Sequence, residues 1–182
     1  MMRYVAFLRA INVGGHVVKM DLLRQLFESL GFSGVETFIA SGNVVFDTAS
    51  KNAKALEKKI ETRLREALGY EVVTFLRTDA ELAEIASYQP FRQPDLEAAV
   101  SLNVVFLGDK LDETSRQKLM ALKTDLDDFD VNGREIYWLS RTKQSESPIS
   151  NAVLTKALGM QSTIRGVNTI KRMAAKHSNA GK

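Results

Sequence analysis

The order of apolar patterns in the first 76 residues is the feature that most limits how this chain can fold. Short apolar runs favour strands, and apolar residues at three- and four-residue spacing favour helices. These rules predict a strand, a helix, two strands, a helix and a strand, over residues 3–8, 20–30, 35–40, 44–46, 52–68 and 72–76. This β-α-β-β-α-β order is the ferredoxin-like, or split-βαβ, pattern.

The same order of elements recurs in the second half. Asn132-Gly133 is the dipeptide that most strongly favours a hairpin turn. Ser147-Pro148 resembles a helix N-cap with a first-turn proline, and Asn168 resembles the N-cap of the last helix. The predicted elements are a linking helix at 79–86, a strand at 100–107, a helix at 112–122, hairpin strands at 129–131 and 135–139, a helix at 147–158, an extended segment at 161–165 and a helix at 168–177.

These patterns predict an α+β protein of two tandem ferredoxin-like (α/β plait) modules. The first module spans residues 1–78, and the second spans residues 79–182 with the linking helix and the C-terminal helix. One larger sheet that shares all the strands is the alternative. Ferredoxin-like scaffolds host many unrelated functions, so this fold does not identify an activity.

Cysteine is absent from the 182 residues, which excludes disulfides, thiolate metal sites and thiol nucleophiles. The apolar stretch Tyr4–Leu8 is too short for the core of a signal peptide, and no run approaches the roughly 18 apolar residues of a membrane span. We therefore expect a cytoplasmic protein without a membrane partner. The two histidines, His16 and His177, show no ligand spacing, so we predict no metal and no other cofactor.

Charge is distributed unevenly along the chain, although the net charge is only +3. Residues 141–182 carry 8 Lys or Arg and 1 Asp or Glu, whereas residues 92–140 carry 6 and 10. A basic C-terminal quarter can bind an anionic partner, or it can be a solvated surface or a surface that faces the acidic segment.

Three long blocks near the N-terminus resemble one family. They are LRAINVGG (Leu8–Gly15), VKMDLLRQLFESLGF (Val18–Phe32) and TFIASGNVVF (Thr37–Phe46). They are similar to the hallmark blocks of the family called domain of unknown function 1697. The resemblance implies a pair of ferredoxin-like modules and no assigned activity.

Two C-terminal blocks, Ser150–Gly159 and Thr163–Met173, resemble the closing blocks of the same family. The chain departs from the family pattern at two places. Ala10 stands where the family usually has glycine, and Gly166-Val167 stands where it usually has Asn-Trp. No role of that tryptophan carries over to this chain.

The loop after the first strand is the first candidate site. A helix N-terminus offers unpaired N–H groups and the positive end of a dipole, and glycines let the backbone approach a ligand closely. Basic side chains can add charge-assisted hydrogen bonds to a phosphate or a carboxylate. The candidate residues are Arg9, Asn12, Gly14, Gly15 and Lys19. The alternative is that the glycines only turn the chain and that Asn12 satisfies loop backbone.

Arg165, Asn168 and Lys171 form the second candidate segment, because a basic residue again precedes a predicted helix start. We expect this segment to approach the first loop and to form one site for a small anionic ligand. The alternative for Arg165 is an ion pair with an acidic cluster, and for Asn168 a capping role alone. The members of the cluster are Asp125, Asp127, Asp128 and Asp130.

Two other functions are open at this point. Nucleic-acid binding through the basic quarter is less expected, because only Tyr137 and Trp138 offer neighbouring aromatic rings and strand alternation puts them on opposite faces. An enzyme acting on a phosphorylated metabolite is the other, but the sequence indicates no nucleophile or general base. Ser41 stands in the turn Ser41-Gly42-Asn43 with no recognisable nucleophile motif around it.

Overall fold

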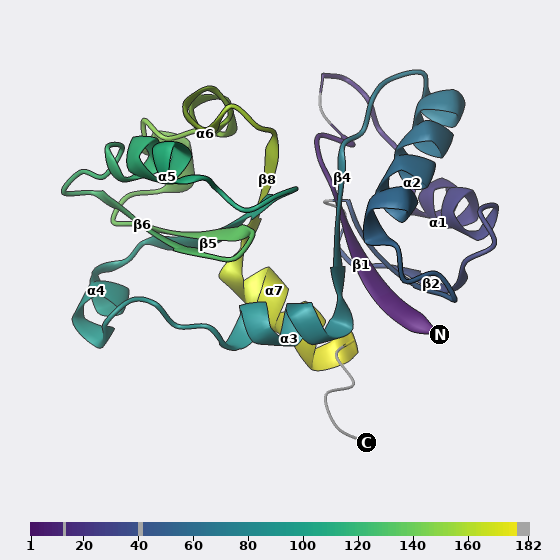
Figure 1. Ribbon diagram of the computed structural model, residues 1–182, viewed down its shortest axis with the longest axis horizontal. Coiled ribbons are helices and arrows are strands. Elements are labelled where there is room, and N and C mark those ends of the chain that lie inside the picture. Colours follow the sequence, from purple (N-terminus) through teal and green to yellow (C-terminus); the bar gives the residue numbers. More distant parts are fainter. Residues whose placement is uncertain (13, 40–41, 178–182) are drawn as a thin grey trace. The chain divides into compact units, whose positions relative to one another are not determined.

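Two separate four-stranded sheets organise the chain (Figure 1). The computed structural model describes residues 1–12, 14–39 and 42–177. The contacts divide the chain into unit 1, residues 1–84 with the segment from Met173 onward, and unit 2, Ile85–Arg172. The protein is therefore α+β with two modules, and a single sheet shared by all strands is wrong. The unit boundaries fall inside two helices instead of between residues 78 and 79.

Unit 1 has the element order that the sequence predicts. Its sheet is antiparallel, with the strand order β2-β3-β1-β4. The predicted strand at 35–40 differs in its bounds, and its last residue lies outside the described residues. The elements are β1 (Met2–Leu8), α1 (Met20–Glu28), β2 (Ser33–Thr37), β3 (Asn43–Thr48), α2 (Ala53–Leu68) and β4 (Thr74–Thr78).

The central strand β1 is buried on both of its faces. Tyr4, Ala6 and Leu8 belong to the core beneath α1 and α2, which lie on one face of the sheet (Figure 1). Val5 and Phe7 point to the opposite face and are also fully buried. Burial on both faces is the reason that β1 is a continuous apolar run instead of an alternating one.

Helix α3 (Asp79–Ser87) begins directly at the end of β4. Thr78 Oγ1 accepts a hydrogen bond from the N–H of Glu81, and the Glu81 carboxylate accepts one from the N–H of Thr78, at 3.1 and 2.8 Å. This reciprocal pair is a capping box, in which two otherwise unpaired N–H groups are satisfied together. Asp79 is therefore the first helical residue. Helix α3 ends at Ser87, one residue beyond the predicted helix 79–86.

Unit 2 repeats this topology, with the antiparallel strand order β6-β7-β5-β8. The predicted hairpin is confirmed, since Asn132 pairs with Glu135 across a turn in which Gly133 has a φ of +62°. The elements are α4 (Gln93–Ala98), β5 (Ser101–Leu107), α5 (Glu113–Met120), β6 (Asp127–Asn132), β7 (Glu135–Ser140), the 3₁₀ helix η1 (Gln144–Glu146), α6 (Asn151–Leu158), β8 (Ser162–Gly166) and α7 (Val167–His177).

Two predicted helix starts in unit 2 are wrong. Ser150, not Ser147, is the N-cap of α6, because its Oγ accepts a hydrogen bond from the N–H of Val153. Helix α7 already begins at Val167, so Asn168 lies inside its first turn and is not the N-cap. Each true start lies within three residues of the predicted one.

Ser147 instead completes a buried network on the helix-covered side of the second sheet. Asp127 is 1% exposed, and its carboxylate accepts hydrogen bonds from Trp138 Nε1 at 2.8 Å and from Ser147 Oγ at 3.1 Å. Trp138 is itself fully buried. A buried carboxylate is tolerated only when such donors replace water, so these three residues stabilise the fold as a group.

Substituting Asp127→Ala is expected to lower the free energy of unfolding by about 2–3 kcal/mol, because the Trp138 N–H is left buried without an acceptor. Ser147→Ala, which keeps the Trp138 bond, is expected to cost about 1 kcal/mol. Urea unfolding can be followed by the fluorescence of Trp138, the only tryptophan of the chain. Equal effects of the two substitutions would contradict this account of the network.

The exposed edge of the first sheet is covered by two carboxylates of α2. Strand β4 is at the end of the strand order. Glu57 accepts a hydrogen bond from the N–H of Leu76 at 3.1 Å, and Glu61 accepts one from the N–H of Thr74 at 3.3 Å. An edge strand with free N–H groups is a template for pairing with another chain, so these bonds block such pairing.

Burial raises the pKa of Glu61, and the hydrogen bond from Thr74 opposes that shift only partly. A raised carboxyl pKa means that ionisation of Glu61 destabilises the folded state. The protonated carboxyl therefore contributes stability at low pH, and this contribution is lost as the pH rises above about 4.5. Glu61→Gln, which keeps the acceptor oxygen, is therefore expected to raise the melting temperature at pH 7 and to leave it unchanged near pH 3. Glu66→Gln on the exposed side of α2 is the control, and a gain that does not vary with pH would contradict the prediction.

Candidate functional site

The loop between β1 and α1 is joined to two neighbouring segments of unit 1. Leu8 N donates a hydrogen bond to Gly42 O at 2.8 Å, and Arg9 N donates one to Val73 O at 2.9 Å. Gly42 precedes β3, and Val73 precedes β4. The first bond brings together the LRAINVGG block and the SGNVVF block, which lie about thirty residues apart in the sequence.

Gly42 is the position at which these two blocks pack most closely. A Cβ on Gly42 would lie 2.8 Å from Ile11 Cγ2 and 3.2 Å from the Leu8 carbonyl oxygen, and its φ is +80°. Only glycine meets both conditions without displacing the loop. The sequence analysis explained Gly42 as part of a turn and missed this contact, for which the sequence carries no local signal. Ser41, beside it, lies outside the described residues.

Side chains fix the shape of the loop at its start and at its end. Asn12 Oδ1 accepts a hydrogen bond from the N–H of Val18 at 2.8 Å. Tyr70 Oη donates one to the carbonyl of Ile11 at 2.8 Å, and the ring of His16 stacks on Tyr70 with centroids 4.0 Å apart. The side-chain oxygen of Asn12 thus satisfies loop backbone. Nothing in the sequence links Tyr70 to this loop. Neither Tyr70 nor the ring of His16 that stacks on it was therefore among the predicted site residues.

The middle of the loop is open to solvent. Gly14 and Gly15 have φ values of +69° and +84°, and no atom lies within 4 Å of the place where a Cβ would be. These glycines are therefore required by backbone conformation and not by crowding. Ala10, with a φ of +56°, adopts the same left-handed region without being glycine. Glycine adopts this region without the steric penalty that a Cβ brings.

Ala10→Gly is expected to stabilise the protein by about 0.5–1 kcal/mol, because it removes the left-handed penalty of about 1–2 kcal/mol and adds back a smaller entropic cost. The side chain of Ala10 is exposed and contributes no packing. Melting temperature should rise by about 1–4 °C. Ala67→Gly in α2 is the matched control and is expected to destabilise, by up to about 1 kcal/mol. A loss of stability in both variants would contradict the strain at Ala10.

Two cations of the loop have no partner in the described part of unit 1. The side chains of Arg9, which is half-buried, and Lys19, which is exposed, make neither an ion pair nor a hydrogen bond with the described residues. Lys19 is the N-cap residue of α1, and its side chain forms no capping bond. Asp21 in the first turn pairs instead with Arg24 at 3.6 Å. The start of α1 therefore presents positive charge and uncapped N–H groups.

Arg165, the first member of the second candidate segment, is buried. It is 9% exposed, and its Nη1 donates hydrogen bonds to Thr163 Oγ1 at 2.8 Å and to Ile164 O at 2.9 Å. Burial lowers the pKa of Arg165 to about 10. Arg77 occupies the equivalent position of β4, is fully buried and donates to the Leu76 carbonyl at 2.8 Å. This repetition indicates a structural role for both arginines.

Three members of the acidic cluster have partners other than Arg165. Asp128 pairs with Lys123 at 2.9 Å, and Asp130 accepts a hydrogen bond from Tyr88 at 2.9 Å. Asp127 is engaged in the network with Trp138 and Ser147 described above. Pairing of Arg165 with the cluster stays a prediction.

The remaining members of the second segment, Asn168 and Lys171, are exposed on α7. Arg9 and Lys19 belong to unit 1, whereas Arg165, Asn168 and Lys171 belong to unit 2. That the two segments meet in one site stays a prediction.

Metal ligands and membrane segments were also sought in the structure. Within residues 1–12, 14–39 and 42–177, no group of three or more His, Asp or Glu side chains is placed to hold a metal ion. In the same ranges, every helix is too short or too polar to cross a membrane.

Comparison with known proteins identifies a family and a similar solved structure. No curated protein matches the sequence. The fold is similar to that of the conserved bacterial protein SP0830 from Streptococcus pneumoniae, with a TM-score of 0.75, 23% identity, and coverage of 97% of this chain and 98% of that one. The family described as protein of unknown function DUF1697 matches residues 1–137, so the two C-terminal blocks lie beyond the match. Because this match spans most of the chain, the protein belongs to the DUF1697 family.

Proposed function

We propose that the protein binds a small phosphate-like anion at the β1–α1 loop of unit 1. The observation that carries this proposal is a pair of cations, Arg9 and Lys19, that have no partner among the described residues. They lie on a loop that Asn12 and Tyr70 hold in shape, beside a helix start without a side-chain cap. Backbone N–H groups at a helix start and basic side chains together favour a phosphate, sulfate or carboxylate.

The equivalent helix of unit 2 shows what the start of α1 lacks. Asp112 is the N-cap of α5, and its Oδ1 accepts a hydrogen bond from the N–H of Ser115 at 2.7 Å. This bond lowers the pKa of Asp112, as expected for a carboxylate stabilised by backbone N–H groups. Lys19 occupies the same place at α1. One helix thus carries its own anion, whereas the other presents a cation and leaves the N–H groups for an external anion.

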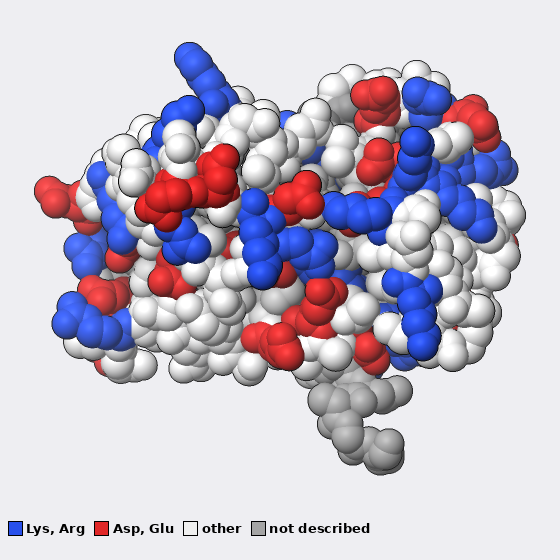
Figure 2. Space-filling model, in the orientation of Figure 1, with Lys and Arg blue, Asp and Glu red and all other residues white. Residues whose placement is uncertain are grey.

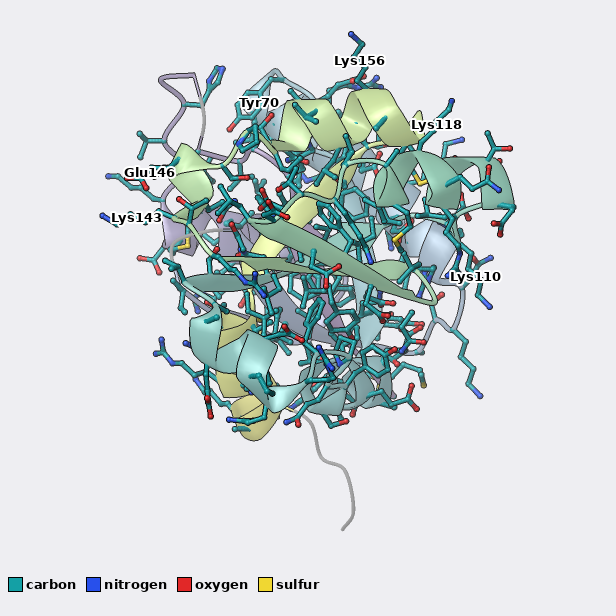
Figure 3. The ribbon with its side chains drawn as sticks, turned by 90° about the vertical axis from the view of Figure 1, so that its left-hand side faces the viewer. Tyr70, Lys110, Lys118, Lys143, Glu146 and Lys156 are labelled. Carbon is teal, nitrogen blue, oxygen red and sulfur yellow. The ribbon has the colours of Figure 1, made fainter. Side chains whose placement is uncertain are left out.

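Nucleic-acid binding, the alternative function, has less support from the arrangement of charge. Lys176 of the basic quarter lies 3.5 Å from Glu36, and Arg141 lies 3.3 Å from Asp95. Lys and Arg side chains are interspersed with Asp and Glu in Figure 2. Lys143 and Lys156 point outward at separate edges of unit 2 (Figure 3). A nucleic acid needs a continuous basic surface, and these positions do not provide one.

The burial of the aromatic residues also argues against nucleic-acid binding. Tyr137 and Trp138 point to opposite faces of the second sheet, and they are only 2% and 0% exposed. RNA-recognition modules stack bases on exposed aromatic rings of such a sheet. Buried rings cannot do so, which favours a small anion over a single-stranded nucleic acid.

We further propose that each unit is a ferredoxin-like plait and that the protein is cytoplasmic. The β-α-β-β-α-β order and the strand orders β2-β3-β1-β4 and β6-β7-β5-β8 support the first point. The absence of cysteine supports the second.

An enzyme acting on a phosphorylated metabolite would place its substrate at the same loop, and the described residues indicate no nucleophile for it.

Thermal denaturation of the full chain with phosphate, sulfate and pyrophosphate tests the anion site. A ligand at 100 times its Kd stabilises the folded state by about 2.7 kcal/mol, which corresponds to about 5–11 °C for a chain of this length. We expect such a shift with at least one anion, and we expect Arg9→Ala/Lys19→Ala to abolish it. Tyr70→Phe, which removes the bond to Ile11, should reduce the shift.

The matched control is Arg116→Ala/Lys110→Ala, which removes the same charges from exposed positions of unit 2. It should retain the full shift with the same anion. Loss of the shift in both double variants would show non-specific charge binding and overturn the proposal. No shift with any small anion, together with oligonucleotide binding that falls steeply with salt, would favour the nucleic-acid alternative.

A further inference from the structure

A small apolar pocket lies in unit 2, apart from the β1–α1 loop. Its volume is about 50 Å³, and two polar residues, Gln89 and Lys171, stand among otherwise mainly apolar and aromatic side chains. It is formed by the end of α3, the segment after it, strands β5 and β7, and the start of α7. The lining residues that shape it most are Ile85, Ala86, Tyr88, Phe91, Val104 and Tyr137.

Hydrogen bonds hold the two tyrosines of the wall. Tyr137 is buried, and its Oη donates a hydrogen bond to the Ile85 carbonyl at 3.3 Å. Tyr88 donates one to Asp130 at 2.9 Å, and its ring centroid lies 4.8 Å from that of Tyr137. Both hydroxyl groups are therefore hydrogen-bonded within the protein, and the rings present apolar surface to the pocket. The wall exists before any ligand binds.

Lys171 and Gln89 supply the polar groups of the pocket. Both side chains are exposed, and neither makes an ion pair or a hydrogen bond with a described residue. An ammonium group and an amide N–H are donors suited to a carboxylate. Positive charge at the edge of an apolar cavity favours a ligand that has an apolar body and one negative end.

We propose that this pocket binds a short-chain monocarboxylate, with its aliphatic tail against Val104 and Tyr137 and its carboxylate at Lys171. The volume of the pocket limits the length of the tail. Since one water molecule needs about 10–15 Å³ of such space, the pocket holds about three or four heavy atoms. Butyrate has a tail of about this size and propionate a tail that is one carbon shorter, whereas a nucleotide or a sugar phosphate does not fit.

The test is titration of the full-length chain with acetate, propionate, butyrate and hexanoate, followed by amide chemical shifts in two-dimensional NMR spectra. We expect butyrate or propionate to bind more tightly than acetate and hexanoate. The shifts should be confined to residues 85–91, 96, 102–104, 137 and 167–171, which line or border the pocket. 1-Butanol and butylammonium, which lack the negative end, should bind at least about tenfold more weakly, as for the loss of one charge-assisted hydrogen bond.

Two variants separate charge from shape. Lys171→Met keeps the length of the side chain and should weaken butyrate binding about tenfold. Ala86→Phe should fill the cavity and abolish binding. Lys110→Met, at a lysine that points outward in Figure 3, is the matched control and should bind butyrate like the wild type. The fluorescence of Trp138 and the melting temperature report whether each variant is folded.

The proposal is overturned if no carboxylate binds, if Lys171→Met and Lys110→Met bind equally, or if the shifts lie elsewhere in the chain. It is independent of the anion site, because Arg9→Ala/Lys19→Ala should retain butyrate binding. Conversely, Ala86→Phe should retain the phosphate-induced rise in melting temperature. Each site can therefore fail without the other.

Discussion

Burial of the central strands on both faces is the constraint on which the rest of the structure depends. In β1 and β5, the side chains that point away from the helices are as buried as those beneath them; Val5, Phe7, Val104 and Phe106 are at most 1% exposed. A sheet in this situation leaves little of its face open to a ligand, and in unit 2 the small pocket lined by Val104 and Tyr137 is such an opening. Polar binding groups are therefore confined to the strand ends, the loops and the helix termini, where N–H groups and charged side chains reach solvent.

The two units follow one plan and differ where ligands can bind. Both end in a strand with a buried arginine in its penultimate position, Arg77 and Arg165, followed at once by a helix. The loops after their first strands differ in charge and capping. In unit 2 the helix start is occupied by the chain's own Asp112, whereas in unit 1 it carries Lys19. The shared plan thus indicates which features are structural, and the difference indicates the candidate site.

The candidate loop was predictable in part. Arg9, the glycines and Lys19 stand out in the sequence because basic residues and flexible backbone precede a helix. Tyr70, His16 and Gly42 did not stand out, because their contacts arise only when distant segments pack together. Tyr70 bonds to Ile11, His16 stacks on Tyr70, and Gly42 packs against Leu8 and Ile11. Burial of Arg165 was missed for the same reason, since an arginine on a short extended segment carries no sign of how much of it the fold covers.

The sequence by itself determined the kind and the order of nearly all elements, since helix and strand periodicity and the Asn132-Gly133 turn are local properties of the chain. It also determined the conformational need for glycine at positions 14 and 15. Only the tertiary structure decided that Ser150 caps α6 and that Ser147 donates its hydroxyl to the buried carboxylate of Asp127. It also decided that the LRAINVGG and SGNVVF blocks lie together and that Lys171 borders an apolar pocket. These features depend on which surfaces meet in the folded chain, and that information is spread over residues far apart in sequence.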